Sequence, residues 1–196
     1  VEDNGSVTTL GKVTAPDAAA SDLFGYSVSQ SGDLLAVGAS SAAVDGKSDA
    51  GAAYLYRVED NGSVTTLGKV TAPDGAEDDY FGTSVSLSGD LLAVGAARAD
   101  GADQNNTGAV YLYRVESNGT VDYLTKLVAP DGTEGDWFGY PVSQSGDLLA
   151  VGAGDVDLDG KEDAGAAYLF RMESNGTATF LAKVIAPDGD EEDYFG

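Results

Sequence analysis

Residues 81–114, FGTSVSLSGDLLAVGAARADGADQNNTGAVYLYR, contain the pattern that decides the fold. Phe81-Gly82 opens a short run in which apolar and polar residues alternate, and a Ser-Gly-Asp turn ends that run. Residues 91–95 are then apolar throughout, and a polar loop leads to a third apolar run over residues 109–115. Short apolar runs separated by turns of Gly, Ser and Asp predict antiparallel β-strands.

A fourth strand follows, and the whole pattern repeats. An Asn-Gly turn at Asn118 joins the third run to a further strand near residues 121–128. Asn-Gly between two such runs is a strong hairpin signal, because both residues tolerate positive φ. Four short strands per unit at a constant period predict the blades of a β-propeller. Equivalent units start at Val1, Val58, Val115 and Met172, each 57 residues after the one before.

The predicted fold class is all-β, since no segment has the sustained 3.6-residue apolar period of a helix. All units belong to one propeller or propeller fragment. Three blades do not close a ring, because propellers have four to eight; a longer chain, an assembly of copies and an open arc are the alternatives. The predicted divisions are residues 1–23 (outer strand of a preceding blade and link), 24–73, 81–130 and 138–187 (three blades), and 188–196 (link and start of a further blade).

Three motifs, Phe-Gly, Leu-Ala-Val-Gly-Ala and Gly-Ala-Ala-Tyr-Leu-Tyr (the last with one substitution in the second and third units), resemble the FG-GAP repeat of integrin α-subunit propellers. The resemblance is closer to bacterial FG-GAP repeat proteins and covers the whole chain. It implies a secreted, extracellular propeller with a structural, adhesive or protein-interaction role. Propellers host many functions, so the resemblance is specific for fold and weak for function. One departure is that the integrin calcium loop lies between the first and second strands, where this chain has a bare Ser-Gly-Asp turn.

The candidate metal loop lies instead between the second and third strands of the third unit, as in the bacterial relatives. Its sequence over residues 155–163, DVDLDGKED, places carboxylates at alternate positions, and Gly160 allows a sharp turn. Such a set of hard oxygen ligands suits Ca²⁺. The alternative reading is a solvated polar loop. The predicted ligands are Asp155, Asp157, Asp159, the carbonyl oxygen of Lys161, and Asp163.

The equivalent loops of the other two units have fewer possible calcium ligands. The first unit keeps two carboxylates, Asp45 and Asp49, so calcium binding there should be weak or absent. The second unit has Arg98 at the first ligand position, which predicts no metal site. The acidic links, such as residues 188–193, favour turns and solvated surface, with a second cation site as the less favoured reading.

Composition limits the classes of partner and of chemistry. The 196 residues include 33 Asp and Glu against 10 Lys and Arg, for a net charge of −23, which argues against nucleic acid or an anionic membrane as a partner. No stretch approaches the length of a membrane span. The absence of His and Cys favours a protein that is not an enzyme, and a glycosidase-like carboxylate pair is the one catalytic chemistry left open.

Two function classes follow from the sequence. The first is an extracellular, calcium-stabilised structural or adhesion module that meets a protein partner or other copies of itself. The second is a carbohydrate-binding, lectin-like propeller, and Trp137 is the aromatic residue best placed to face a ligand. The phenylalanines of the Phe-Gly pairs are predicted to pack in the core: Phe24, Phe81, Phe138 and Phe195.

Overall fold

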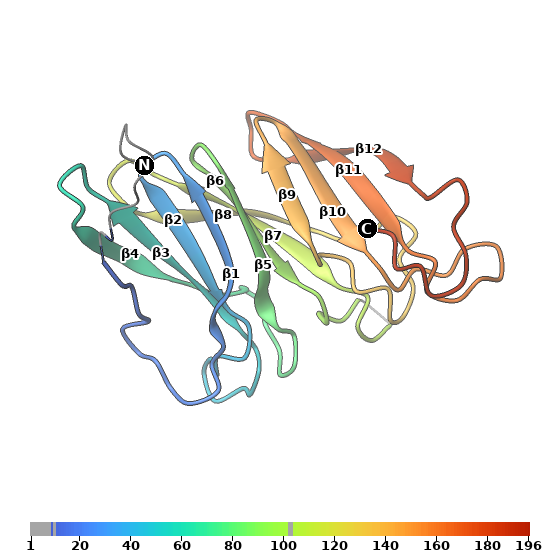
Figure 1. Ribbon diagram of the computed structural model, residues 1–196, viewed down its shortest axis with the longest axis horizontal. Helices are drawn as coiled ribbons and strands as arrows, with labels where there is room; N and C mark the ends of the chain where they lie inside the picture. The colour runs from blue at the N-terminus through green and yellow to red at the C-terminus, as the bar shows by residue number, and fades with distance from the viewer. Residues whose placement is uncertain (1–8, 10, 102–103) are drawn as a thin grey trace.

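The computed structural model describes residues 9, 11–101 and 104–196. Figure 1 shows three four-stranded sheets set side by side. In the described residues there is no helix, and so none that could cross a membrane. Sheet 1 contains β1 (Phe24–Ser31), β2 (Leu34–Ala39), β3 (Ala52–Val58) and β4 (Val64–Val70). Sheet 2 contains β5 (Phe81–Ser88), β6 (Leu91–Ala96), β7 (Ala109–Val115) and β8 (Val121–Leu127). Sheet 3 contains β9 (Val142–Ser145), β10 (Leu148–Ala153), β11 (Ala166–Met172) and β12 (Ala178–Val184).

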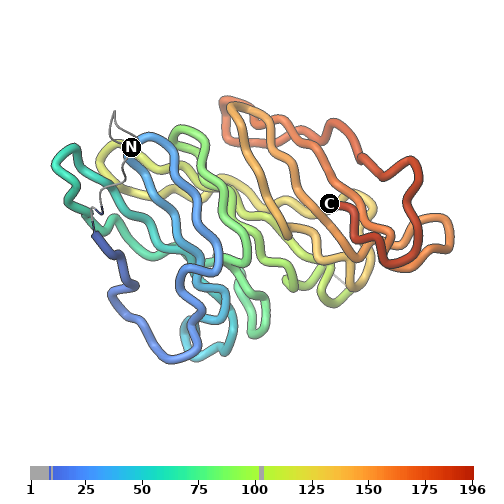
Figure 2. The backbone as a smooth tube through the Cα atoms, viewed as in Figure 1, coloured from blue at the N-terminus to red at the C-terminus, as the bar shows by residue number. Residues whose placement is uncertain are grey.

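The predicted all-β class and the four antiparallel strands per repeat are confirmed. Strands pair in sequence order within each sheet. The predicted outer strand within residues 1–23 lies partly outside the described residues, which omit 1–8 and 10; the described part forms turns and no strand. Ala102 and Asp103 of the second polar loop are also outside. Figure 2 follows the chain from sheet 1 through sheet 2 to sheet 3, where the last residues turn back against sheet 3.

Sheet 3 differs from the prediction at its first strand. β9 starts at Val142, although the equivalent strands β1 and β5 start at their Phe-Gly pairs. Pro141 stands where β5 has Ser84, and proline has no N–H to donate to a strand partner. The Pro141 carbonyl still accepts a hydrogen bond from Gly152 at 2.8 Å. The missing donor shortens the strand without moving the chain away from β10.

The core lies between the sheets. β5 packs on β1, β2 and β3, and β9 packs on β5 and β6. One cluster joins Leu55 of sheet 1 to Val85, Val94 and Tyr111 of sheet 2, and a second joins sheet 2 to sheet 3 in the same way. Phe81 and Phe138 are fully buried, which confirms their predicted core role; Phe24 and Phe195 stand on the two end sheets and are half-buried.

Serine hydroxyls connect the first strands of neighbouring sheets. The first strand of each sheet is an edge strand, so half of its N–H groups have no backbone partner within the sheet. The N–H of Leu87 in β5 donates to the Ser29 hydroxyl of β1 at 2.9 Å. The N–H of Gln144 in β9 donates to the Ser86 hydroxyl of β5 at 2.9 Å. The alternating serines of the first strand therefore satisfy the edge of the next sheet.

The Phe-Gly pairs at Phe81, Phe138 and Phe195 also rest against a glycine that precedes the third strand of the sheet before them. Gly108 has φ +81°, and a Cβ added there would collide with the backbone carbonyl oxygen of Phe138. Gly51 makes the same approach to Phe81, and Gly165 to Phe195. The Phe138 N–H donates to the Thr107 carbonyl at 3.0 Å, which fixes the contact. Only glycine allows two backbones to approach this closely.

An aspartate in each link anchors the next sheet. Asp74 accepts hydrogen bonds from the Tyr111 hydroxyl at 2.7 Å and from the Lys126 ammonium at 2.8 Å. Burial of Asp74 acts to raise its pKa, but the hydrogen bonds from Lys126 and Tyr111 outweigh that effect and hold the pKa below its usual value. The same arrangement occurs as Tyr54–Asp17–Lys69 and Tyr168–Asp131–Lys183.

The glycine contact can be tested by substitution. Gly108→Ala should destabilise the fold by about 3 kcal/mol or more, because it adds an inter-sheet clash to the cost of a left-handed residue. Gly46→Ala is the matched control, since Gly46 has φ +80° and open space around its Cβ position. That variant should lose only about 1–2 kcal/mol. Equal losses of thermal stability in both variants would contradict the contact.

The aspartate anchor predicts a pH dependence. Tyr111→Phe should cost about 1 kcal/mol at pH 7, a small value because the Asp74 carboxylate is half-exposed. A carboxylate whose folded pKa is lowered stabilises the fold above its unfolded pKa of about 3.9. This stabilisation is lost as the pH falls through the folded pKa. The difference in unfolding free energy between wild type and variant should therefore shrink below pH 4, and a constant difference would argue against the anchor.

Candidate functional site

The predicted metal loop forms a tight hairpin turn. Leu158 and Lys161 exchange two backbone hydrogen bonds, at 3.0 and 2.9 Å. Asp159 and Gly160 occupy the two central positions with φ of +53° and +81°, the geometry of a type I′ turn. The first repeat has the same turn between Val44 and Lys47. Turn geometry alone therefore accounts for the Asp-Gly pair in this loop.

The turn separates the five predicted ligands. Its own hairpin uses the Lys161 carbonyl, which accepts from the Leu158 N–H. The Lys161 ammonium contacts the Gly189 carbonyl of the next link and lies 3.6 Å from the Asp190 carboxylate. Asp159 and Lys161 line a hollow against that next link. The structure thus sets these two residues apart from the other three.

Asp155, Asp157 and Asp163 line a different hollow, of about 220 Å³, which we call the acidic hollow. Asp157 Oδ1 accepts the Asp163 N–H at 3.0 Å. Burial raises the pKa of Asp155, and the charges of Asp163 and Asp136 add to that effect. The sequence analysis did not single out the further acids contributed by the preceding link and by the loop itself, which are Glu134, Asp136 and Glu162.

The donor chemistry of the acidic hollow suits a hard cation, since six carboxylates surround it. In the described part of the chain, however, no group of three or more His, Cys, Asp or Glu side chains is arranged to hold a metal ion. The predicted five-ligand shell is therefore not assembled here, and only Asp155, Asp157 and Asp163 share one hollow. A cation would have to draw these side chains together.

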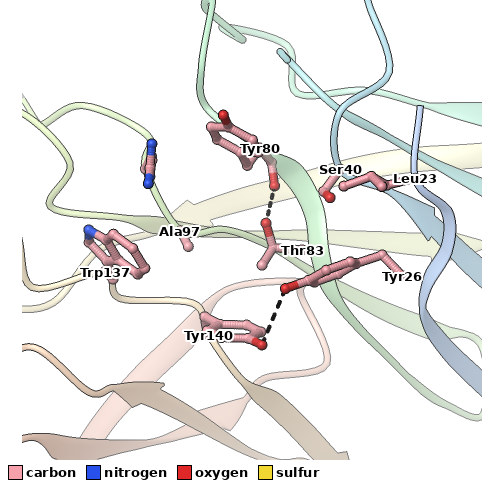
Figure 3. Close-up of a pocket in the computed structure, with 9 residues that line it drawn as sticks. Leu23, Tyr26, Ser40, Tyr80, Thr83, Ala97, Trp137 and Tyr140 are labelled. Atoms are coloured by element: carbon pink, nitrogen blue, oxygen red, sulfur yellow. Dashed lines mark hydrogen bonds between the residues drawn. The ribbon is translucent and has the colours of Figure 1, made fainter. Parts of the chain in front are cut away.

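A second hollow, of about 210 Å³, lies where the three sheets meet, and we call it the aromatic hollow (Figure 3). Figure 3 shows the rings of Tyr26, Tyr80, Trp137 and Tyr140 around Thr83. Equivalent positions of the three repeats supply most of these side chains, because β1, β5 and β9 lie side by side. The lining residues are Leu23, Tyr26, Ser40, Tyr80, Thr83, Ala97, Arg98, Trp137 and Tyr140.

The guanidinium group of Arg98 lies close to two aromatic rings. Its central carbon is 5.0 Å from the Tyr80 ring centroid and 4.9 Å from the Trp137 ring centroid, within the range of cation–π attraction. Tyr80 and Trp137 both have φ of +55°, a left-handed conformation that is unusual for bulky residues. The sequence analysis placed Arg98 only as a residue that excludes a metal.

Two tyrosine hydroxyls meet across the aromatic hollow. The hydroxyl oxygens of Tyr26 and Tyr140 are 3.5 Å apart, although these residues belong to the first and third repeats. The hydrogen bond with Tyr26 and partial burial raise the pKa of Tyr140. The predicted ligand-facing position of Trp137 is consistent with its place in this hollow. Tyr26, Tyr80 and Tyr140 were missed, since only the stacking of the sheets brings equivalent positions together.

Comparison with solved structures finds proteins of similar fold. Sqt1 from Chaetomium thermophilum is similar with a TM-score of 0.53 and 17% identity, over 87% of this chain and 38% of that chain. The chain thus spans 38% of the length of that protein, and the likeness concerns the fold alone. The computationally designed protein Ika4 is similar with a TM-score of 0.49 and 13% identity, over 90% of this chain and 98% of that chain. No curated protein sequence matches the chain.

The family model described as FG-GAP repeat matches three times, over residues 7–56, 64–113 and 123–170. These three segments cover most of the chain, and each contains the first two strands and most of the third strand of one sheet; the second and third segments also include the last strand of the preceding sheet, in whole or in part. Two features recur at equivalent positions of successive repeats. Serine hydroxyls of one first strand accept N–H groups of the next first strand. The glycine before the third strand contacts the Phe-Gly pair of the next repeat. The chain belongs to the FG-GAP repeat family.

Proposed function

We propose that the three sheets are blades of an extracellular, calcium-stabilised β-propeller that assembles by stacking a second copy of the chain on its end faces. FG-GAP repeats indicate a structural or protein-interaction module. The observation that carries the proposal is the exposure of residues on the end sheets whose equivalents are buried between sheets. The proposed role is not catalytic, and its partners are proteins rather than nucleic acid.

The first end face lies on sheet 1. Val28 of β1 is 65% exposed, although its equivalents Val85 and Val142 are 6% and 7% exposed. The latter two are covered by the preceding sheet. Burying a valine side chain contributes about 1.5–3 kcal/mol. The β1 face therefore has the same apolar side chain that makes the interior contacts of the chain.

The second end face lies on sheet 3. Leu148 of β10 is 46% exposed, whereas its equivalent Leu34 is 6% exposed beneath sheet 2. Ser143 and Ser145 of β9 are exposed, whereas their equivalents Ser29 and Ser31 accept N–H groups from β5 and from the turn that follows it. Sheet 3 thus offers free hydroxyl acceptors and an apolar surface at the position that a further first strand would cover.

The two end faces are complementary halves of one interface that the chain already contains twice. A second copy can place its β1 against β9 with the contacts that β5 makes to β1 once its residues 17–25 displace the equivalent residues 188–196, which hold that place on sheet 3 within one chain. Such a head-to-tail contact is heterologous, so it produces a ring or an open array. The net charge of −23 opposes association between copies, and salt or a bound cation would reduce that repulsion.

Substitution of Val28 tests the assembly. Wild-type protein should show an average mass in sedimentation that rises above one chain as its concentration increases. Val28→Asp should stay at the mass of one chain, because a carboxylate would be buried without a partner in the contact. Val128→Asp is the matched control, since Val128 is also exposed but lies in the link after β8.

Two results would contradict the proposed contact. Wild-type protein that keeps the mass of one chain at every concentration would exclude assembly by stacking. Val28→Asp protein that associates as strongly as wild type would show that a different surface is used. Thermal melting of both variants confirms that each one is folded before its mass is compared.

Calcium is the proposed stabilising ion, and the acidic hollow is its proposed site. Asp155, Asp157 and Asp163 supply carboxylates from the loop, and Glu134 and Asp136 supply them from the link. Burial raises the pKa of Asp155 and the charges of Asp163 and Asp136 raise it further; a cation there would offset the repulsion between these carboxylates. Extracellular modules bind calcium with dissociation constants of about 10⁻⁴–10⁻³ M, which suits an extracellular location.

Calcium should raise the melting temperature. With such dissociation constants, 10 mM Ca²⁺ stabilises the folded state by about 1–3 kcal/mol, which corresponds to a rise of roughly 3–10 °C for a chain of this size. The double variant Asp155→Asn, Asp163→Asn should lose that rise. The equivalent double variant in the first repeat, Asp45→Asn, Asp49→Asn, should keep it. A melting temperature that ignores calcium and EDTA in the wild type would refute the site.

Carbohydrate binding is the second candidate function, and the aromatic hollow favours it. Tyr and Trp rings combine a flat apolar face with a polar edge, which suits ligands that have both kinds of surface. Leu23, Tyr26 and Tyr140 are exposed at the hollow, so a ligand can reach them. This candidate is independent of assembly, because the aromatic hollow is formed within one chain.

A further inference from the structure

We infer that the aromatic hollow binds an acidic sugar, a single pyranose ring that carries a carboxylate. This inference rests on the second candidate function, carbohydrate binding, and not on the assembly of copies. It follows from the size of the hollow, the arrangement of its aromatic rings, and the chemistry of Arg98 and Ser40.

The size of the hollow limits the ligand. Its volume of about 210 Å³ is below the 300–1,000 Å³ of pockets that take drug-sized molecules, so it accommodates one ring. Ala97 lies among the rings, and Thr83 uses its hydroxyl on the Tyr80 carbonyl, which leaves its methyl group for contact. The rings of Tyr26, Tyr140 and Trp137 offer apolar faces to the C–H surface of a sugar.

Arg98 is the group that selects for a carboxylate. The other three arginines each pair with an aspartate: Arg57 with Asp33, Arg114 with Asp90 and Arg171 with Asp147. Among the described residues, no carboxylate lies within 4.0 Å of the Arg98 side-chain nitrogens. The rings of Tyr80 and Trp137 hold the guanidinium at the hollow by cation–π attraction. Its parallel N–H donors match the two oxygens of a carboxylate.

Polar groups for the sugar hydroxyls converge on the same space. Ser40 lines the hollow, where its hydroxyl can both donate to and accept from a sugar hydroxyl. The contact between the Tyr26 and Tyr140 hydroxyls, at 3.5 Å, is at the limit of a hydrogen bond. Both hydroxyls can therefore turn to a ligand.

The charge of the whole chain does not exclude an acidic ligand. The net charge of −23 repels an anion at long range, but at physiological salt this repulsion is screened over about 8 Å. Arg98 lies at the hollow itself, and it stands where the third repeat has Asp155. At this one repeat position, Asp155 adds a negative charge to the acidic hollow and Arg98 adds a positive charge to the aromatic hollow.

Isothermal titration with matched sugars tests the inference. The probes are the methyl glycosides of glucuronic and galacturonic acid, each compared with its neutral counterpart from glucose or galactose. The acidic member should bind roughly tenfold to a hundredfold more tightly, the effect of hydrogen bonds to a charged group. Arg98→Gln should abolish that preference and leave equal, weak binding. Arg57→Gln, which removes an arginine that pairs with Asp33, should leave the preference unchanged.

The outcomes distinguish the preference for an acidic sugar from carbohydrate binding in general. Equal affinity for acidic and neutral sugars, lost in Trp137→Ala, would uphold carbohydrate binding and overturn the acidic preference. No binding of any of the four glycosides by protein with an unchanged melting temperature would overturn both. Binding of a peptide carboxylate in the hollow in place of the sugars would also overturn the inference.

Discussion

The first strand of every sheet has one edge without a backbone partner, and the stacked arrangement depends on how that edge is satisfied. An unpaired edge exposes N–H groups that either remain in water or find another acceptor. Here the acceptors are serine hydroxyls of the preceding sheet, as in the bonds from Leu87 to Ser29 and from Gln144 to Ser86. Side-chain hydroxyls reach farther than a backbone carbonyl, so neighbouring sheets can face one another rather than merge into one continuous sheet.

Glycine and aspartate residues both stabilise the contact between neighbouring sheets, at different strands. Gly51 and Gly108 let the Phe-Gly backbone approach closely, which buries Phe81 and Phe138 completely. Asp74 then fixes the outer part of sheet 2 through Tyr111 and Lys126. Each sheet is thereby held by its neighbour at the inner and outer strands. Stability in such a chain is nearly a sum of local contacts between adjacent units, and sheet 2 receives such contacts from both sheet 1 and sheet 3.

The sequence predicted the repeated architecture well, because its signals are local. Period, Asn-Gly turns and apolar runs determine four strands per unit regardless of what surrounds them. The candidate sites were harder to predict because they form between units. Trp137 could be selected from the sequence because the equivalent residues of the other repeats are not tryptophan. No local pattern, however, shows that the hydroxyls of Tyr26 and Tyr140, 114 residues apart in the chain, lie close together. The alternate carboxylates of 155–163 suggested one ligand shell, yet the type I′ turn at Asp159 and Gly160 directs the loop so that Asp159 and Lys161 face a different link.

Ser41, Arg98 and Asp155 occupy one position in three successive loops, and they show how repeats with a common core acquire different surfaces. The backbone is held alike at this position, since the N–H of Ser41 donates to the Asp22 carbonyl at 3.3 Å and that of Arg98 to the Asp79 carbonyl at 3.4 Å. The side chain is not needed for stacking, so it is free to change. An arginine there lies within cation–π distance of Tyr80 and Trp137, and an aspartate there joins a group of carboxylates. Packing thus restricts Phe, Gly and Ser to fixed places in every repeat, and differences in binding chemistry are confined to the loop and link positions that packing leaves unconstrained.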